Sequence, residues 1–131
     1  MYKPAIITGL ITAALAVMLG AFGAHGLKAM VSPDQLAIFE KGVTYQFYHS
    51  FALLAAGILH SAYPHKAVRA AAPLFGTGIL LFSGSLYLMV ALSTSGHSIG
   101  AAGIITPIGG LCFIAGWSAL LAGILKKKQA P

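Results

Sequence analysis

Residues 4 to 24 read PAIITGLITAALAVMLGAFGA, and none of these 21 side chains is charged. Three more uncharged and mainly apolar runs follow, at residues 44–62, 70–93 and 103–125. A helix of about 20 apolar residues is long enough to cross the hydrocarbon layer of a membrane, which is about 30 Å thick. The sequence therefore predicts an all-α membrane protein, with one domain over residues 1–131 in which four transmembrane helices form a bundle.

The composition agrees with a membrane location, because 58% of the residues are apolar and 8% are charged. A typical soluble domain has about 25% charged residues. The formal charge of +6 does not indicate nucleic-acid binding, since most basic residues cluster in three short segments outside the apolar runs. These residues are Lys3, Lys66, Arg69, Lys126, Lys127 and Lys128. We expect the lipid bilayer to be the main partner, with no nucleic acid.

The distribution of charge also predicts the orientation of the chain. An even number of spans places the N-terminus, the loop at residues 63–69 and the C-terminal tail on one side. Lys and Arg are enriched on the cytoplasmic side of membrane proteins, so we expect both termini in the cytoplasm. The other side has two lysines, which are accompanied by the two acidic residues of the chain. These four residues are Lys28, Lys41, Asp34 and Glu40.

A short amphipathic helix is predicted at residues 33–42, on the outer surface between the first two spans. Ser32 can cap this helix, and Gln35 stands where a capping box requires it. The apolar residues that share one face are Leu36, Phe39 and Val43. A straight helix over residues 33–62 would be about 45 Å long, which exceeds the membrane thickness. We therefore expect a kink or a protruding end near Gly42.

Small residues recur every seven positions in two of the spans. One series is Gly9, Ala16 and Gly23, and the other is Ala102, Gly109, Gly116 and Gly123. Gly76 and Ser83 extend the pattern to the third span. Such a period keeps one stripe of a helix against its partner in a left-handed bundle, and small residues let the backbones approach closely. The alternative is the general abundance of glycine in membrane helices.

Polar side chains within the spans gather, on this topology, between the outer boundary and the middle of the membrane. The candidate site comprises His25, Tyr45, Gln46, His49, Ser83 and Ser85. Such groups need hydrogen-bond partners in a low-dielectric environment, and each can be a partner for another. One interpretation is that they form interhelical hydrogen bonds that fix the helix register. The other is a ligand-binding patch that opens outward.

The sequence leaves three functions open. The patch could bind a small amphiphile, a lipid headgroup or a quinone-like molecule, either within one chain or between subunits of a homo-oligomer. The protein could instead be a structural or assembly subunit whose glycine seams contact another membrane protein. A small oligomeric transporter or channel is the third alternative, and it would need His49 as the titrating group.

Catalysis and metal binding are not expected. A nucleophile would have to be Ser83 or Ser85 with His49 as its base, and the spans contain no carboxylate to orient that histidine. His25, His49 and His97 could all lie toward the outer side, but their spacing is not that of a metal site. We therefore expect no enzyme, no cofactor and no metal.

Five short motifs resemble a known family. They are GAFGAHGL at residues 20–27, YQFYH at 45–49, LFSGSLY at 81–87, TPIGG at 106–110 and the pair Gly116-Trp117. In this order they resemble a small four-span membrane family of unknown function, which includes bacterial YgdD-like and YwdK-like proteins and relatives of human transmembrane protein 256. The resemblance extends over nearly the whole chain. It implies a multi-pass protein of the bacterial inner (plasma) membrane, and it implies no activity.

Overall fold

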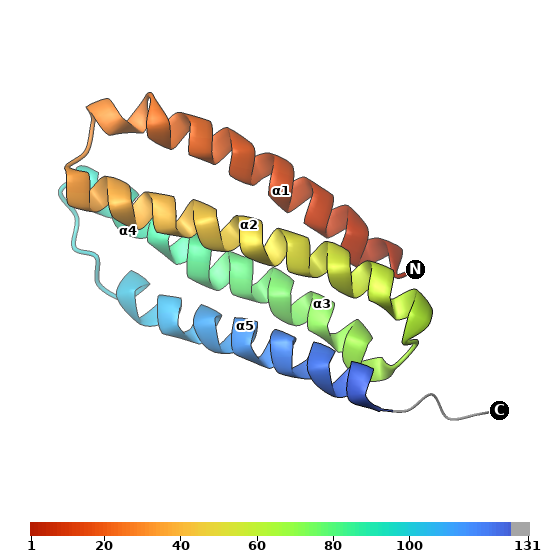
Figure 1. The fold of residues 1–131 in the computed structure, drawn as a ribbon. Coiled ribbons are helices and arrows are strands. Elements are labelled where there is room, and N and C mark those ends of the chain that lie inside the picture. Colours follow the sequence, from red (N-terminus) through yellow and green to blue (C-terminus); the bar gives the residue numbers. More distant parts are fainter. Residues whose placement is uncertain (127–131) are drawn as a thin grey trace.

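The computed structural model describes residues 1–126 and consists of helices joined by short connections (Figure 1). The elements are α1 (Lys3–Ala24), the 3-10 turn η1 (Leu27–Ala29), α2 (Pro33–Ala62), α3 (Lys66–Gly78), the π-helical turn η2 (Ile79–Ser83), α4 (Gly84–Thr94) and α5 (Ala102–Leu125). The prediction of an all-α bundle is confirmed. Lys127 and Lys128, which contribute to the predicted charge asymmetry, lie outside the described residues.

Four helical rods make up the described part of the chain, because α3, η2 and α4 follow one another without a break and form the third rod. α1 packs along α2, and α5 packs along the third rod. α2 then joins the two pairs through its contacts with α3, η2 and α4. α1 and α5 therefore lie on opposite sides of the bundle (Figure 1).

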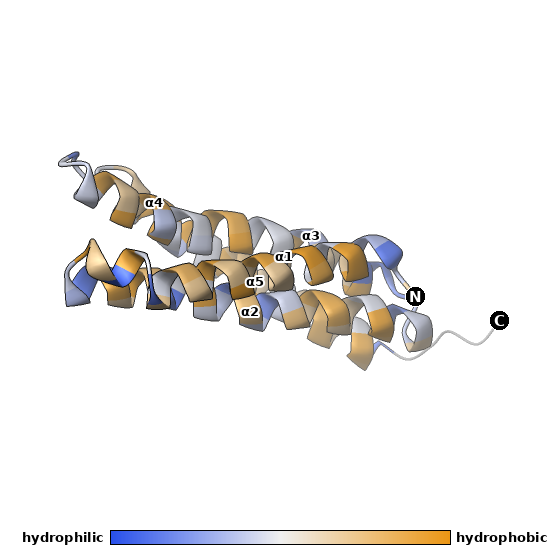
Figure 2. Ribbon diagram, turned by 90° about the horizontal axis from the view of Figure 1, so that it is seen from above, coloured by the Kyte–Doolittle hydropathy of each residue, from blue (hydrophilic) through white to orange (hydrophobic). Residues whose placement is uncertain are grey.

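Three of the described rods are long and apolar enough to cross a membrane: Lys3–Ala29, Lys66–Thr94 and Ala102–Leu125. α2 has the length but is less apolar, since it contains Gln46 and His49. Figure 2 shows this difference, with strongly hydrophilic residues near the ends of the rods and also along α2. That α2 spans the membrane as well therefore stays a prediction.

The predicted outer helix is the first part of α2 and not a separate element. Its capping box is present, because Ser32 Oγ accepts a hydrogen bond from Gln35 N at 3.2 Å and Ser32 N donates to Gln35 Oε1 at 2.9 Å. The helix continues without interruption through Gly42. Phe39 and Val43 are buried within the bundle, beside residues of η1 and α4. The apolar face of this segment thus packs on the protein.

The two heptad series of small residues are helix-packing seams, as predicted. All seven residues are buried. A Cβ atom on Gly9 would lie 2.9 Å from Ser50 O of α2, and one on Gly123 would lie 2.8 Å from Val68 N of α3. These positions therefore admit little more than glycine. Gly76 was predicted to extend the seams, but this is wrong, because nothing lies within 4 Å of a Cβ atom built there.

The two ends of the bundle differ in charge. Lys3 begins α1, Lys66 and Arg69 begin α3, and Lys126 follows α5, so these cations share one end of the bundle, named the basic end here. The opposite end contains η1 and the start of α2. Its charged residues are Lys28, Asp34, Glu40 and Lys41.

Candidate functional site

Gln46 lies at the centre of a buried network that links three rods. It comes from α2 and is 4% exposed. Its Nε2 donates to Thr12 O of α1 at 2.8 Å, and its Oε1 accepts a hydrogen bond from the Tyr87 hydroxyl of α4 at 2.8 Å. One amide therefore uses both its donor and its acceptor to set the register of three helices.

Ser50 extends this network one helical turn toward the basic end. Its hydroxyl oxygen lies 2.7 Å from Gln46 O and 2.8 Å from Thr12 Oγ1. Thr12 in turn donates to Thr8 O at 2.8 Å. Ser50 is completely buried, so its hydroxyl group is bound by protein atoms and not by water.

Two serines of the third rod form hydrogen bonds with different helices. Ser83 ends the π-helical turn and donates to Gly42 O of α2 at 2.6 Å. Ser85 donates to Phe82 O at 2.8 Å, and its oxygen lies 2.6 Å from Thr106 Oγ1 of α5. The sequence prediction grouped these serines together, whereas in the structure Ser83 binds α2 and Ser85 binds α5.

His49 belongs to α2 but faces α5. Its ring lies parallel to that of Phe113, with centroids 3.3 Å apart and an interplanar angle of 5°. Trp117 Nε1 donates to His49 Nε2 at 3.2 Å, and His49 Nδ1 lies 2.8 Å from Tyr45 O. Since Nε2 accepts, these partners assign the proton to Nδ1, which donates to Tyr45 O. Both ring nitrogens of a neutral imidazole are therefore satisfied.

Tyr45 and His25 lie at the edge of the predicted site or outside it. Tyr45 is 37% exposed, and its ring stacks on Phe82 with centroids 4.6 Å apart. His25 follows the end of α1 and is exposed, and it makes no side-chain hydrogen bond within the described part of the chain. The expectation that His25 joins the other five residues is therefore not met, because Leu27 takes the buried position at this end.

The six-residue candidate site left out five residues that share these hydrogen bonds, namely Thr12, Ser50, Tyr87, Thr106 and Trp117. Thr12 stands three positions after Gly9 and four before Ala16, so the heptad series already placed it on the face of α1 that meets α2. Trp117 follows seam residue Gly116 directly. Thr12 gave no signal of its own, because threonine is common in apolar runs, and the motif Gly116-Trp117 does not show which side chain the tryptophan contacts.

The network leaves no free polar group for a ligand. Every buried side-chain nitrogen or oxygen within residues 1–126 has a hydrogen-bond partner in the protein. In the same residues, no three His, Cys, Asp or Glu side chains lie close enough together to bind a metal ion. The arrangement is that of interhelical hydrogen bonds which fix the packing.

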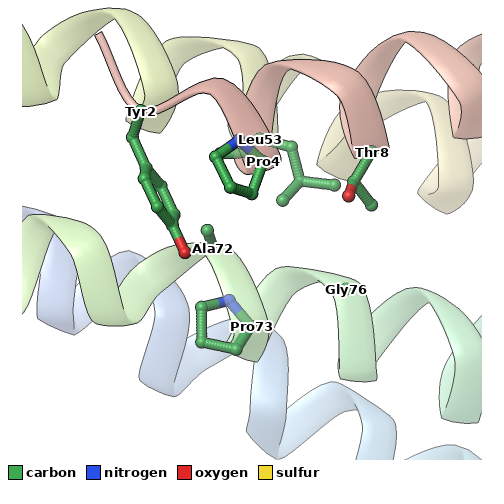
Figure 3. Close-up of a pocket in the computed structure, with 8 residues that line it drawn as sticks. Tyr2, Pro4, Thr8, Leu53, Ala72, Pro73 and Gly76 are labelled. Atoms are coloured by element: carbon green, nitrogen blue, oxygen red, sulfur yellow. The ribbon is translucent and has the colours of Figure 1, made fainter.

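A groove lies elsewhere, between α1 and α3 toward the basic end, with α2 behind it (Figure 3). It has a volume of about 220 Å³. Apart from the hydroxyl groups of Tyr2 and Thr8, the side chains that line it are apolar. The lining residues are Tyr2, Pro4, Ala5 and Thr8 of the N-terminal segment, Leu53 of α2, and Ala72, Pro73 and Gly76 of α3. The groove exists because α1 follows α2 closely but scarcely touches α3.

Comparison with models of known protein families finds one that matches residues 19–110, and its description is "Protein of unknown function (DUF423)". The matched range includes Gln46, His49, Ser83 and Ser85. The chain belongs to the DUF423 family. This DUF423 protein is 45% identical to UPF0382 membrane protein SAB0533 of Staphylococcus aureus over 92% of the chain and 94% of the relative. It is 46% identical to UPF0382 membrane protein SSP2132 of Staphylococcus saprophyticus over 95% and 98%, respectively.

Another relative of this DUF423 protein is UPF0382 membrane protein YwdK of Bacillus subtilis, with 40% identity over 95% of the chain and 98% of the relative. The resemblance to the YwdK family is therefore confirmed. No solved structure matches the chain. The names of these relatives describe bacterial membrane proteins, so this chain is a membrane protein, and they give no activity.

Proposed function

We propose that this DUF423 protein binds a membrane amphiphile without catalysing a reaction, and that the groove between α1 and α3 is the binding site. The observation behind the proposal is the groove itself, which combines an apolar lining with two hydroxyl groups. Small-molecule sites in proteins typically have this character, with a mainly apolar wall and a few polar groups. A groove at the side of a membrane bundle can admit a molecule directly from the lipid.

The polar network has a different role in this proposal. A ligand at Gln46 or His49 would have to displace hydrogen bonds that are already well formed, such as those at 2.8 Å to Thr12 O and Tyr45 O. Leaving such groups without partners costs about 1 to 3 kcal/mol each. We therefore assign the network to helix register, and the binding site to the groove.

The same contacts argue against an enzyme. Ser83 and Ser85 donate to main-chain carbonyl groups, and His49 binds Tyr45 and Trp117. A serine nucleophile needs a base that accepts its proton, and neither serine donates to His49. A transporter would need His49 as a titrating group in contact with water. The ring of His49 is instead packed against Phe113, which argues against this role.

We further propose that the protein lies in the bacterial inner membrane with the basic end in the cytoplasm. The four described cations of this end support the orientation: Lys3, Lys66, Arg69 and Lys126. The groove would then open toward the inner leaflet. A reporter that is active only in the cytoplasm, fused after residue 131, should be active, and an active periplasmic reporter at the same place would refute the orientation.

Filling the groove tests the binding proposal. A side chain at Gly76 would point into open space, so Gly76→Leu should fill the groove and leave the fold intact. Gly84→Leu is the matched control, because Gly84 also has nothing within 4 Å, lies on the same rod and does not line the groove. Native mass spectrometry of protein extracted in a mild detergent should show a bound amphiphile for wild type and Gly84→Leu.

Gly76→Leu should show at least about a tenfold lower occupancy, which corresponds to about 1.4 kcal/mol of lost binding free energy. Equal occupancy in Gly76→Leu and Gly84→Leu would place the ligand outside the groove. If wild type retains no amphiphile at all, the proposal fails, and the role as an assembly subunit is favoured.

A further inference from the structure

The groove ends among cations that come from two helices. Lys3 stands between Tyr2 and Pro4, which both line the groove. On α3, residues 66, 69, 73 and 76 follow one stripe of the helix, so Lys66 and Arg69 continue the line of Pro73 and Gly76 toward the end of the bundle. All three cations are exposed.

Arg69 is connected to the groove by a direct contact. Its guanidinium carbon lies 5.1 Å from the centre of the Tyr2 ring. This separation is within the range of a cation–π interaction. Tyr2 is fixed in turn, because its main-chain N donates to Gly57 O of α2 at 2.9 Å. In Figure 3 the Tyr2 ring reaches across toward Ala72, so the phenol closes one end of the groove, and its contact with Tyr2 places the Arg69 guanidinium beside that end.

Negative charge is absent from this end of the described chain. The two acidic residues, Asp34 and Glu40, lie near the start of α2, whereas the groove lies beside Leu53 and the end of that helix. From Glu40 to Leu53, thirteen residues of helix span about 20 Å, which is more than twice the screening length of about 8 Å at physiological salt. The cations at the groove therefore create a positive potential that favours an anionic group.

We infer that the amphiphile is an anionic phospholipid, and this inference rests on the proposed function. One acyl chain lies in the groove along Pro4, Ala5, Leu53, Ala72 and Pro73. The phosphate lies at the basic end, among Lys3, Lys66 and Arg69. The groove is too small for a whole lipid, so the second chain stays in the bilayer.

The three basic side chains favour an anionic lipid over a zwitterionic one. A choline headgroup brings a cation beside the phosphate, which three basic side chains would repel, whereas a glycerol headgroup is neutral and leaves the phosphate charge uncompensated. Each Lys or Arg near an anionic lipid surface contributes about fivefold in affinity. Loss of Lys66 and Arg69 together should therefore weaken binding by about 25-fold.

The test uses the full chain in a mild detergent, titrated with phosphatidylglycerol or with phosphatidylcholine of the same acyl chains. Bound lipid is measured by native mass spectrometry. Wild type should prefer phosphatidylglycerol by at least about tenfold, since three cations contribute. The double variant Lys66→Gln/Arg69→Gln should lose most of this preference, since Lys3 alone remains at the site. The matched control Lys28→Gln/Lys41→Gln removes two cations from the opposite end and should keep it.

Each outcome separates the inference from the function on which it rests. If wild type binds both lipids equally well and Gly76→Leu abolishes both, the groove binds amphiphiles but the assignment to anionic phospholipids is wrong. If Lys28→Gln/Lys41→Gln loses the preference as fully as Lys66→Gln/Arg69→Gln, net charge and not this site selects the lipid. If neither lipid binds, the inference fails, and the proposed function stands only if wild type retains another amphiphile that Gly76→Leu loses.

A free anion is distinguished in the same experiment. Inorganic phosphate at 10-fold excess over the lipid should not displace phosphatidylglycerol, because it has no acyl chain for the groove. Displacement by phosphate would show a simple anion site and would overturn the inference. Circular dichroism of each variant confirms that the helices are retained before the lipid measurements are compared.

Discussion

The substitution Gln46→Leu tests whether the buried network fixes the bundle. Leucine is close to glutamine in size but has no polar atoms, so the packing volume is preserved. The variant loses the hydrogen bonds to Thr12 O and from the Tyr87 hydroxyl, both 2.8 Å long. Thr12 O belongs to α1 and keeps its main-chain partner within the helix. The larger loss falls on Tyr87, whose hydroxyl has no other hydrogen bond among the described residues.

The magnitude follows from these two bonds. An interhelical hydrogen bond within a membrane contributes about 0.6 kcal/mol on average and up to about 1.7 kcal/mol. A buried hydroxyl left without a partner costs about 1 to 3 kcal/mol. We therefore expect Gln46→Leu to lower the free energy of unfolding by about 1.5 to 3 kcal/mol, and Tyr87→Phe, which leaves the buried Gln46 Oε1 without this partner, to lower it by about 1 to 3 kcal/mol.

The effects of Gln46→Leu and Tyr87→Phe on the free energy of unfolding should not be additive, because both variants remove the same hydrogen bond. The double variant should be about 1 kcal/mol more stable than the sum of the two single effects predicts. The assay is reversible unfolding in mixed micelles with increasing dodecyl sulfate, followed by circular dichroism. Tyr48→Phe is the control, because Tyr48 belongs to the same helix as Gln46 but is 59% exposed. Additive effects, or an unchanged Gln46→Leu protein, would refute the assignment of the network to helix register.

Two further predictions use the same unfolding assay. Gly109→Ala should destabilise the protein by about 1 to 3 kcal/mol, because the new Cβ would lie 2.8 Å from Phe82 Cα, whereas Gly103→Ala on the same helix should have no unfavourable effect, since nothing lies within 4 Å. Equal stabilities of these two variants would contradict the close seam. His49→Ala should cost about 2 to 4 kcal/mol, because it removes the ring stacked on Phe113 and the acceptor for Trp117, while His25→Ala should stay within about 0.5 kcal/mol. A destabilised His25→Ala protein would show that its exposed position is wrong.

The parts of the fold that follow from a repeated spacing of residues or from a capping motif could be predicted from the sequence. The seams at Gly9 and Gly109 follow from a seven-residue repeat, and the start of α2 follows from the capping residues Ser32 and Gln35. The rotation of each helix about its axis could not be predicted in the same way. Gln46 and His49 are three residues apart, and on sequence alone they belong to neighbouring stripes that could meet the same helix. In the structure Gln46 binds α1 and α4, whereas His49 binds α5.

The candidate site shows the same limit. The sequence placed Gln46, His49, Ser83 and Ser85 at similar depths, but depth alone does not say which partners they bind. The π-helical turn at Ile79–Ser83 adds to the difficulty, because its wider turn changes the faces of the third rod after Gly84, and the sequence has no signal for it. The groove was missed for another reason, since it results from the way α1 leans on α2 and away from α3.

The two glycine seams have a consequence for biogenesis. One seam joins α1 to α2 and the other joins α5 to the rod before it, so each seam lies inside a hairpin of consecutive helices. Each half can therefore become compact while it enters the bilayer, before the other half has been synthesised. The hydrophobic effect does not drive the two hairpins together, because they are already surrounded by hydrocarbon. Their association therefore depends on packing and on the hydrogen bonds between them. Those bonds are Gln35 with Ser93, Gln46 with Tyr87, Gly42 with Ser83, and His49 with Trp117.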